Sequence, residues 1–184
     1  QIRKLADDFL NDPAEVAVAP ASKPIERIEQ KVMFAEKSVK PRLLISLLRD
    51  PAIERAVIFT RTKHGADRLC RDLDRAGIEA QPIHGNKSQN QRERTLSAFR
   101  EGSLQFLVAT DIAARGIDID DVSHVFNYEL PNVPEIYVHR IGRTARAGKS
   151  GNAIAFCDGS ERSLLRDIEK LTGIRIPVVD VAIN

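Results

Sequence analysis

The sequence has few cysteines and no long apolar run. Its two cysteines, Cys70 and Cys157, are far apart, and neither belongs to a CxxC pair or has a histidine at ligand spacing. This pattern argues against a zinc site and predicts two buried, reduced thiols. The longest apolar runs are short, such as Ala56–Phe59, whereas a membrane-spanning helix needs about 20 apolar residues. We therefore expect a soluble, cytoplasmic protein with no membrane partner.

An excess of charge of one sign is also missing. The 184 residues contain 28 Lys and Arg against 26 Asp and Glu, which leaves a net charge of +2. This is too little to indicate a nucleic acid or a membrane surface by itself. The hydrophobic share of 42% excludes a disordered chain and suffices for one full domain. Of the 28 basic residues, 19 are arginines, whose planar fork suits phosphate oxygens.

From residue 25 onward, strand-like apolar runs alternate with helical patterns. We expect strands at Ile28–Phe34, Ala56–Phe59, Ile78–Ile83, Leu104–Ala109, Val122–Tyr128 and Ala153–Cys157, and helices at Val39–Leu48, Gly65–Ala76, Gln89–Phe99, Pro134–Ile141 and Glu161–Leu171. This alternation predicts right-handed βαβ units, and so an α/β fold with an open, mostly parallel sheet and helices on both faces. Such sheets bind ligands at the carboxyl ends of their strands.

The first 26 residues do not continue this alternation. Residues 1–10 have apolar residues at helical spacing, and Asn11-Asp12-Pro13 ends that pattern. The stretch Pro20–Pro24 has the composition of a linker. We therefore expect residues 1–19 to be the tail of a preceding domain, 20–26 an interdomain linker and 27–184 one domain.

The strongest charge feature follows the fifth expected strand. Between Glu135 and Asp158 there is no acidic residue, but there are four basic ones: Arg140, Arg143, Arg146 and Lys149. On a helix, arginines at steps of three lie near one face and repel each other unless an anion lies in front of them. A solvated basic surface is the alternative, although the apolar residues around the arginines favour a half-buried helix.

Polar residues follow other strands as well. Thr110 and Asp111 can cap a short helix, and Asp118 can accept a hydrogen bond from a sugar hydroxyl. The cluster of Asp118, Asp120 and Asp121 has a magnesium site as one interpretation, but a solvated turn at Asp120 is favoured over it. After the strand that ends at Ile83, a glycine and helix N-terminal donors suit an extended polyanion: Gly85, Gln89 and Arg92.

The sequence lacks the phosphate-binding loop GxxxxGK[ST] and the GxGxxG pattern, which removes the usual nucleotide sites. Arginines that suit a γ-phosphate, without such a loop, are typical of one half of a composite site to which arginine fingers are supplied across an interface. His139 alone favours a packing role, because no nucleophile is arranged beside it.

Four segments in order resemble motifs of the DEAD-box RNA helicases. Motif VI corresponds to YVHRIGRTARAG (137–148), motif V to residues 107–120, motif IV to AVIFTRTK (56–63) and the QxxR element to residues 89–92. They make residues 27 to about 172 similar to the second, C-terminal RecA-like domain of these enzymes. The reading GRTARAG, with Ala145 where most relatives have glycine, places the bacterial RhlE-like subgroup nearest.

The resemblance implies roles for individual residues. Arg143 and Arg146 would be arginine fingers, His139 would link motif VI to the first domain's acidic box, and Asp118, with Gly116 nearby, would contact the ATP ribose. The implied RNA-backbone contacts are Arg61, Thr62, Lys63, Gly85, Gln89, Arg92 and Thr110. ATP with Mg²⁺ would be held mainly by the N-terminal RecA-like domain, which the sequence lacks, and no metal ligand is expected in this chain.

The implied partners are therefore RNA, without base preference, and the N-terminal domain of the same protein. On this interpretation the isolated 184 residues are inactive, and the full-length protein is an ATP-dependent RNA helicase. Two alternatives stay open. One is a non-catalytic RNA- or protein-binding module of the same fold, and the other is a DNA-directed helicase of the same superfamily.

Overall fold

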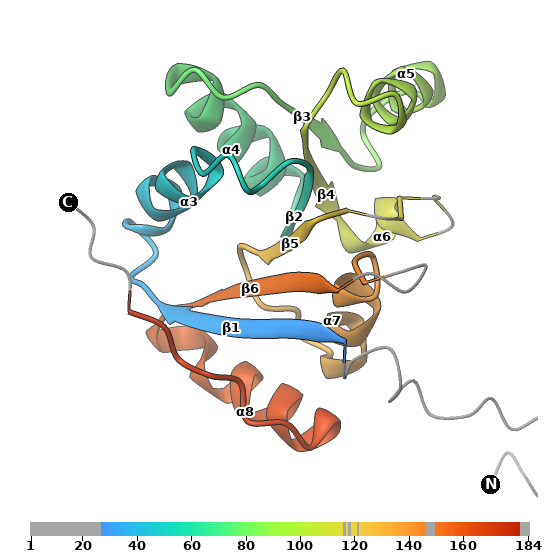
Figure 1. Ribbon diagram of the computed structural model, residues 1–184. Coiled ribbons are helices and arrows are strands. Elements are labelled where there is room, and N and C mark those ends of the chain that lie inside the picture. The colour runs from blue at the N-terminus through green and yellow to red at the C-terminus, as the bar shows by residue number, and fades with distance from the viewer. Residues whose placement is uncertain (1–26, 116, 118, 121, 146–149, 181–184) are drawn as a thin grey trace, which may run out of the picture.

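The computed structural model describes residues 27–115, 117, 119, 120, 122–145 and 150–180, and these form an α/β domain around a single sheet (Figure 1). The strands are β1 (Ile28–Phe34), β2 (Ala56–Thr60), β3 (Ala80–Ile83), β4 (Phe106–Thr110), β5 (His124–Asn127) and β6 (Gly151–Cys157). Their order in the sheet is β1-β6-β5-β2-β4-β3, and all neighbouring pairs are parallel. The predicted fold class is confirmed. The expected tail and linker, residues 1–26, lie outside the described residues.

Helices pack on both faces of the sheet (Figure 1). They are α3 (Lys40–Leu48), α4 (Lys63–Arg75), α5 (Gln89–Arg100), α6 (Asp111–Ala114), α7 (Pro134–Ile141) and α8 (Arg162–Thr172), with a short 3-10 turn, η1 (Gly159–Glu161), before α8. The strand expected from Ile78 begins only at Ala80. The amide of Ile78 bonds to the carbonyl of Leu73 instead and closes the end of α4, where Gly77 has a φ of 76°.

Alternation along the buried strands divides the core between the two faces. In β2, Ala56 and Ile58 pack with the buried residues of α3 and α4 on one face. Val57 and Phe59 face the other side, where α5 and α6 cover the sheet near β2, β4 and β3. On that same side α7 and α8 cover β1 and β6. Because β2 is fully buried, it reads as a continuous apolar run.

The carboxyl ends of the parallel strands meet at one edge of the sheet. Thr60, Ile83 and Thr110 end the three neighbouring strands β2, β3 and β4, which fixes the segments after them close together. The next strand along the sheet on the other side, β5, leads into α7. The predicted contacts in the segments after β2, β3 and β4, such as Arg61, Gly85 and Thr110, therefore lie at the carboxyl ends of their strands, as expected for this fold.

The start of β6 is packed against the end of the α7 segment. Gly151 is buried, and a Cβ on it would lie 2.6 Å from the backbone nitrogen of Ala145 and closer still to the side chain of Thr144. The Thr144 hydroxyl donates to the carbonyl of Val122, which joins this segment to the sheet. Only glycine lets the chain approach so closely here.

We therefore expect Gly151→Ala to lower the free energy of unfolding by about 1–3 kcal/mol, because the added methyl group forces the backbone near Ala145 to move. Urea unfolding of the chain would measure this change. Gly159→Ala is the control, since no described heavy atom lies within 4 Å of a Cβ at Gly159 and a change within about 0.5 kcal/mol is expected. Equal stabilities for the two variants would contradict the packing argument.

Candidate functional site

A cavity of about 310 Å³ opens between α6 and α7. It is lined by Phe59, Asp111, Ala114, Arg115, Ile136, His139, Arg140 and Arg143. Of the predicted site residues, His139 and Arg143 thus share one cavity. His139 is exposed on α7, which does not support the packing role favoured from the isolated histidine. The lining combines guanidinium and imidazole groups, which suit an anionic ligand.

Arg140 is buried and does not belong to a solvated basic surface, which agrees with the half-buried helix favoured from the sequence. Its side chain is 1% exposed and pairs with Asp111 through two bonds, Nε to Oδ1 at 2.6 Å and Nη2 to Oδ2 at 2.8 Å. Its Nη1 donates to the Asn127 side chain at 3.0 Å and to the Glu129 carbonyl at 2.7 Å, and the group lies over the Phe59 ring. The burial of Arg140 is possible because these partners replace its hydration.

Arg143 lies beyond α7, which ends at Ile141, so the arginines are not arranged along one helix. Its guanidinium donates to the carbonyls of Ile117 at 3.1 Å and Ala114 at 3.4 Å. It also lies 3.5 Å from Asp120. Asp120 is therefore a charge partner of motif VI, and not merely part of a solvated turn as expected from the sequence. These contacts join Arg143 to the segment after β4.

The residue after Thr144 has an unusual backbone. Ala145 has a φ of 58°, the one positive φ of a non-glycine among the described residues. An L-residue in this region is strained by about 1–2 kcal/mol relative to glycine. Three predicted site residues, Gly116, Asp118 and Arg146, lie outside the described residues, and so does Asp121 of the acidic cluster.

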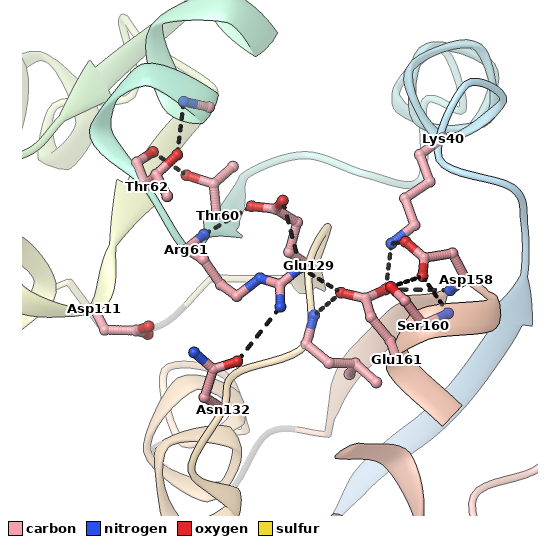
Figure 2. A network of polar contacts seen from close by, with 12 residues as sticks. Lys40, Thr60, Arg61, Thr62, Asp111, Glu129, Asn132, Asp158, Ser160 and Glu161 are labelled. Carbon is pink, nitrogen blue, oxygen red and sulfur yellow. Dashed lines mark hydrogen bonds and ion pairs between the residues drawn. The ribbon is translucent and has the colours of Figure 1, made fainter. Parts of the chain in front are cut away.

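A buried ionic network connects the loops that follow the carboxyl ends of the strands (Figure 2). At its centre is Glu161, whose Oε2 accepts from Lys40 Nζ and from the Asp158 amide. Its Oε1 accepts from the Leu130 amide at 3.0 Å and lies 3.4 Å from an Arg61 nitrogen. One carboxylate thus joins α3, β6, the loop after β5 and the loop after β2.

Asp158 shares the Lys40 ammonium with Glu161, at 3.3 Å from Nζ. Burial raises the pKa of Asp158, but hydrogen bonds from Ser160 and the attraction of Lys40 outweigh it and lower the pKa to about 2. The Asp158 carboxylate therefore stays ionised at physiological pH. A buried lysine is tolerated here because two carboxylates surround it.

The three predicted RNA contacts after β2 are differently exposed. Arg61 has 30% of its side chain exposed, and Glu129, Glu161 and Asn132 surround its guanidinium (Figure 2). The Thr62 hydroxyl caps α4 by accepting from the Gly65 amide. Lys63 is exposed and donates to the Asn86 side chain at 3.1 Å. Lys63 is thus the cation of this loop most open to a ligand, whereas Arg61 already has anionic partners.

The remaining predicted RNA contacts follow β3 and β4. Gly85 and Gln89 are exposed, and Thr110 is buried. Thr110 precedes α6 as expected, although its side chain makes no capping hydrogen bond. Arg92 Nη2 donates to the Ala113 carbonyl at 3.4 Å, while its buried Nε has no partner among the described residues. A buried guanidinium donor without a partner favours a ligand acceptor at this point.

Sequence analysis did not consider Lys40, and it named Arg140 only as a basic residue of the acid-free stretch, without its pairing with Asp111. Both lie at helical spacing with buried apolar residues, Arg140 beside Tyr137 and Ile141, and Lys40 beside Leu43 and Leu44. This spacing is the signal that could have revealed their burial. The pattern does not reveal the partner carboxylates, because Asp111 and Glu161 are distant in sequence.

The two cysteines are free and buried, as predicted. Burial raises the pKa of Cys70 to about 12 and that of Cys157 to about 11, so neither thiol is poised to react. Within the described part of the chain, no group of three or more His, Cys, Asp or Glu side chains could hold a metal ion. No described helix is long and apolar enough to cross a membrane.

Comparisons with known proteins identify relatives across the whole domain. The model of the helicase conserved C-terminal domain matches residues 39–148. The DEAD-box ATP-dependent RNA helicase CshA of Bacillus subtilis is 40% identical over 188 residues, covering 100% of this chain and 38% of that protein. RhlB of Shewanella sediminis, an ATP-dependent RNA helicase, is 41% identical over 180 residues, covering 98% of this chain and 41% of that protein. The chain spans about two fifths of the length of these relatives.

Solved structures of DEAD-box proteins are also similar to this chain. The E. coli DEAD-box protein SrmB, bound to the regulator of ribonuclease activity A, matches with a TM-score of 0.78 and 38% identity over 84% of this chain and 91% of that chain. S. cerevisiae Dbp5 bound to RNA and ADP BeF3 matches with a TM-score of 0.85 and 33% identity over 97% of this chain and 48% of that chain. Together with the parallel sheet, these likenesses define a RecA-like domain.

The chain belongs to the DEAD-box RNA helicases, and it forms the C-terminal RecA-like domain of that family. The motif resemblance found in the sequence is thereby confirmed. Its assignment to the RhlE-like subgroup stays a prediction.

The positive φ of Ala145 predicts how replacing this residue with glycine changes stability. We expect Ala145→Gly to raise the free energy of unfolding by about 0.5–1 kcal/mol, because relief of the left-handed strain exceeds the extra entropy of glycine in the unfolded chain. Ala76→Gly is the matched control, since Ala76 has a φ of −90° and should lose stability by about 0.5–1 kcal/mol. Urea unfolding of both variants would show opposite signs, and a loss of stability in Ala145→Gly would refute the strain.

Proposed function

We propose that this chain is the C-terminal half of an ATP-dependent RNA helicase. It supplies arginine fingers to ATP held mainly by the N-terminal RecA-like domain, and half of a site for the RNA backbone. The observation that carries this proposal is that His139 and Arg143 line one cavity, beside a sheet edge that bears the candidate RNA contacts. Family membership supports the same assignment, and the relatives named above are RNA helicases.

On the nucleotide side, Arg143 and Arg146 would neutralise charge that develops on the γ-phosphate, and Asp118 with Gly116 would contact the ribose. His139, exposed on α7, would contact the N-terminal domain. ATP with Mg²⁺ supplies a phosphoryl group that water can attack. The described residues fit this division of labour, because the cavity offers cationic donors to an anionic ligand.

On the RNA side, the contacts would run along one strand's sugar-phosphate backbone, from Arg61, Thr62 and Lys63 past Gly85 to Gln89, Arg92 and Thr110. Arg92 Nε, which has no partner among the described residues, and the ammonium of the exposed residue Lys63 are donors that suit phosphate oxygens. Phosphate and sugar contacts position the protein but do not read bases. Binding should therefore be independent of sequence and sensitive to salt.

The implied mechanism is domain closure. ATP and single-stranded RNA would each bridge the two domains, so neither half-site binds well alone. In the closed state the bound strand would be kinked away from duplex geometry, which separates a short duplex locally. Hydrolysis and phosphate release would then reopen the domains. We infer that the 184 residues alone have no ATPase activity and bind RNA weakly, and that the full-length protein acts in the cytoplasm.

A non-catalytic RNA- or protein-binding module is the second candidate. The observation that supports it is the exposed Lys63 beside Asn86, which could contact RNA without any catalytic role. A phosphate loop and an acidic box encoded upstream of Gln1 would decide for the enzyme. Stimulation of the intact enzyme by DNA as well as by RNA would instead favour a DNA-directed helicase of the same superfamily.

The arginine-finger role predicts the effect of Arg143→Ala in the full-length protein. RNA-stimulated ATP hydrolysis should fall by about 10³-fold or more, because an arginine finger is worth about 10³–10⁵ in rate. Arg166→Ala, on the exposed surface of α8, is the control and should hydrolyse ATP as the wild type does. Steady-state turnover at saturating RNA would measure both, with urea unfolding to verify folding. Near-wild-type turnover of Arg143→Ala would refute the role.

The RNA-contact role of Gly85 has its own test. A Cβ on Gly85 would have no described heavy atom within 4 Å, and its φ is not positive, so the fold alone does not require glycine there. Gly85→Ala should therefore keep the free energy of unfolding within about 0.5 kcal/mol but weaken RNA binding, because the methyl group blocks close approach of the backbone to a phosphate.

Gly159→Ala is the matched control for this variant, since Gly159 is equally open and exposed but is not one of the proposed RNA contacts. Fluorescence anisotropy of labelled oligouridylate, with the full-length protein and a non-hydrolysable ATP analogue, would compare the two. Equal RNA affinities for Gly85→Ala, Gly159→Ala and the wild type would remove Gly85 from the proposed RNA site.

A further inference from the structure

A buried histidine supports the loop that carries Gly85. His84 is 2% exposed and is the first residue after β3. Its Nε2 lies 3.0 Å from Oδ1 of Asp67, which projects from α4. Its Nδ1 accepts from the Asn86 amide at 3.3 Å. The imidazole therefore connects α4 to the turn formed by residues 84–87.

These two contacts select one tautomer of the neutral imidazole. Because the Asn86 amide can only donate, Nδ1 must be without a proton. The proton of neutral His84 is then on Nε2, from which it is donated to Asp67. A carboxylate that fixes the tautomer of a histidine in this way also fixes the orientation of the ring. The turn amide of Asn86 thus depends on Asp67, although the two residues do not touch.

Asp67 holds the same turn through a second contact. Lys87 Nζ lies 3.1 Å from the Oδ1 that accepts from His84. Lys63 Nζ bonds to the Asn86 side chain from the neighbouring loop, so both cations lie next to the turn. Burial raises the pKa of Asp67, but the hydrogen bonds from His84 and Lys87 outweigh this effect, and the pKa lies below its ordinary value.

The hydrophobic core does not explain Asp67. The apolar face of α4 consists of Ala66, Leu69, Cys70 and Leu73, whereas the Asp67 side chain is 31% exposed. A carboxylate beside a path for phosphates is also unfavourable in a purely electrostatic account, since like charges repel. Its position is explained if it orients the donors of the turn.

We propose that Asp67 is a positioning residue for RNA binding, which acts through His84 and Lys87 to hold the turn of residues 84–87 in the shape that meets the RNA backbone. The proposal rests on the RNA-binding function proposed above. It assigns a role to a residue outside the segments that carry the motif resemblance to the DEAD-box family. It also predicts that loss of the Asp67 side chain weakens RNA binding, whereas simple charge repulsion predicts that binding becomes tighter.

Two substitutions separate positioning from charge. Asp67→Ala removes both the negative charge and the acceptor for His84. It should weaken binding of labelled oligouridylate by about fivefold, which corresponds to the net free energy of about one hydrogen bond. Asp67→Asn removes the charge but keeps an acceptor for Nε2, and should bind within about twofold of the wild type. Asp74→Ala, an exposed carboxylate on the same helix, is the control. Charge repulsion alone predicts that Asp67→Ala and Asp67→Asn bind RNA equally and more tightly than the wild type.

The binding measurements use the full-length protein with a non-hydrolysable ATP analogue and Mg²⁺, and urea unfolding verifies that each variant folds. If the wild type itself does not bind RNA, the proposed function fails. If the wild type binds RNA and Asp67→Ala binds as tightly or more tightly, the positioning role alone is overturned.

The imidazole gives an independent readout. Long-range ¹H–¹⁵N correlation spectra of the 184-residue chain should show His84 with its proton on Nε2 in the wild type and in Asp67→Asn. In Asp67→Ala, we expect loss of this single tautomer, with the turn amide of Asn86 shifted. A proton on Nδ1 in the wild type, or an unchanged imidazole in Asp67→Ala, would overturn the positioning role even in a folded variant.

Discussion

The buried ion pair between Arg140 and Asp111 is the contact on which the geometry of the cavity depends. It fixes α6 against α7 by two parallel hydrogen bonds, and the same guanidinium reaches Asn127 and the Glu129 carbonyl at the end of β5. Removing one partner of such a pair costs about 3–5 kcal/mol, because the other charge stays buried. His139 and Arg143 flank the pair in sequence, so their positions relative to Thr110 are set by it. His139 and Arg143, proposed for the ATP side, are thereby connected through one ion pair to Thr110, proposed for the RNA side.

Glu161 has the equivalent role further along the same edge. It joins the loops after β2 and β5 to Lys40 and to the end of β6 (Figure 2). Loops after parallel strands otherwise have few backbone partners, because the sheet has already ended. Two buried charge centres, Arg140 and Glu161, provide these partners. Burial of both is tolerated because each charged group has several hydrogen bonds, which gives the edge a defined shape.

Much of the fold could be predicted from the sequence, and the reasons differ between its parts. The alternating apolar runs identify the strands and the longer helices, since the periods of 2 and 3.6 residues are local. The bounds of β1 and α7 agree with the expectation. The start of β3 does not, because the amide of Ile78 closes α4 through a bond that only the folded chain reveals.

Only the site residues that lie in a recognisable sequence motif could be predicted. His139 and Arg143 were found through the motif resemblance, and the structure brings them into one cavity. The ion pairs of Lys40 and Arg140 were not predicted, because their partners are distant in sequence: Glu161 is 121 positions from Lys40, and Asp111 is 29 positions from Arg140. No local period reports a pairing of that kind. Long-range ion pairs are the part of such a site that a single sequence conceals.

The pairing of the cations at the edge has a consequence for the proposed function. Arg61 is surrounded by Glu129 and Glu161, and Arg143 is held by two carbonyls and Asp120. A phosphate that binds these groups must share or replace acceptors that the domain already provides, so the net gain from one half-site is small. Donors on a second domain would add contacts to the same phosphate without giving up acceptors within this domain. The weakness of each half alone and the joint binding of ATP and RNA on closure would then have one electrostatic cause.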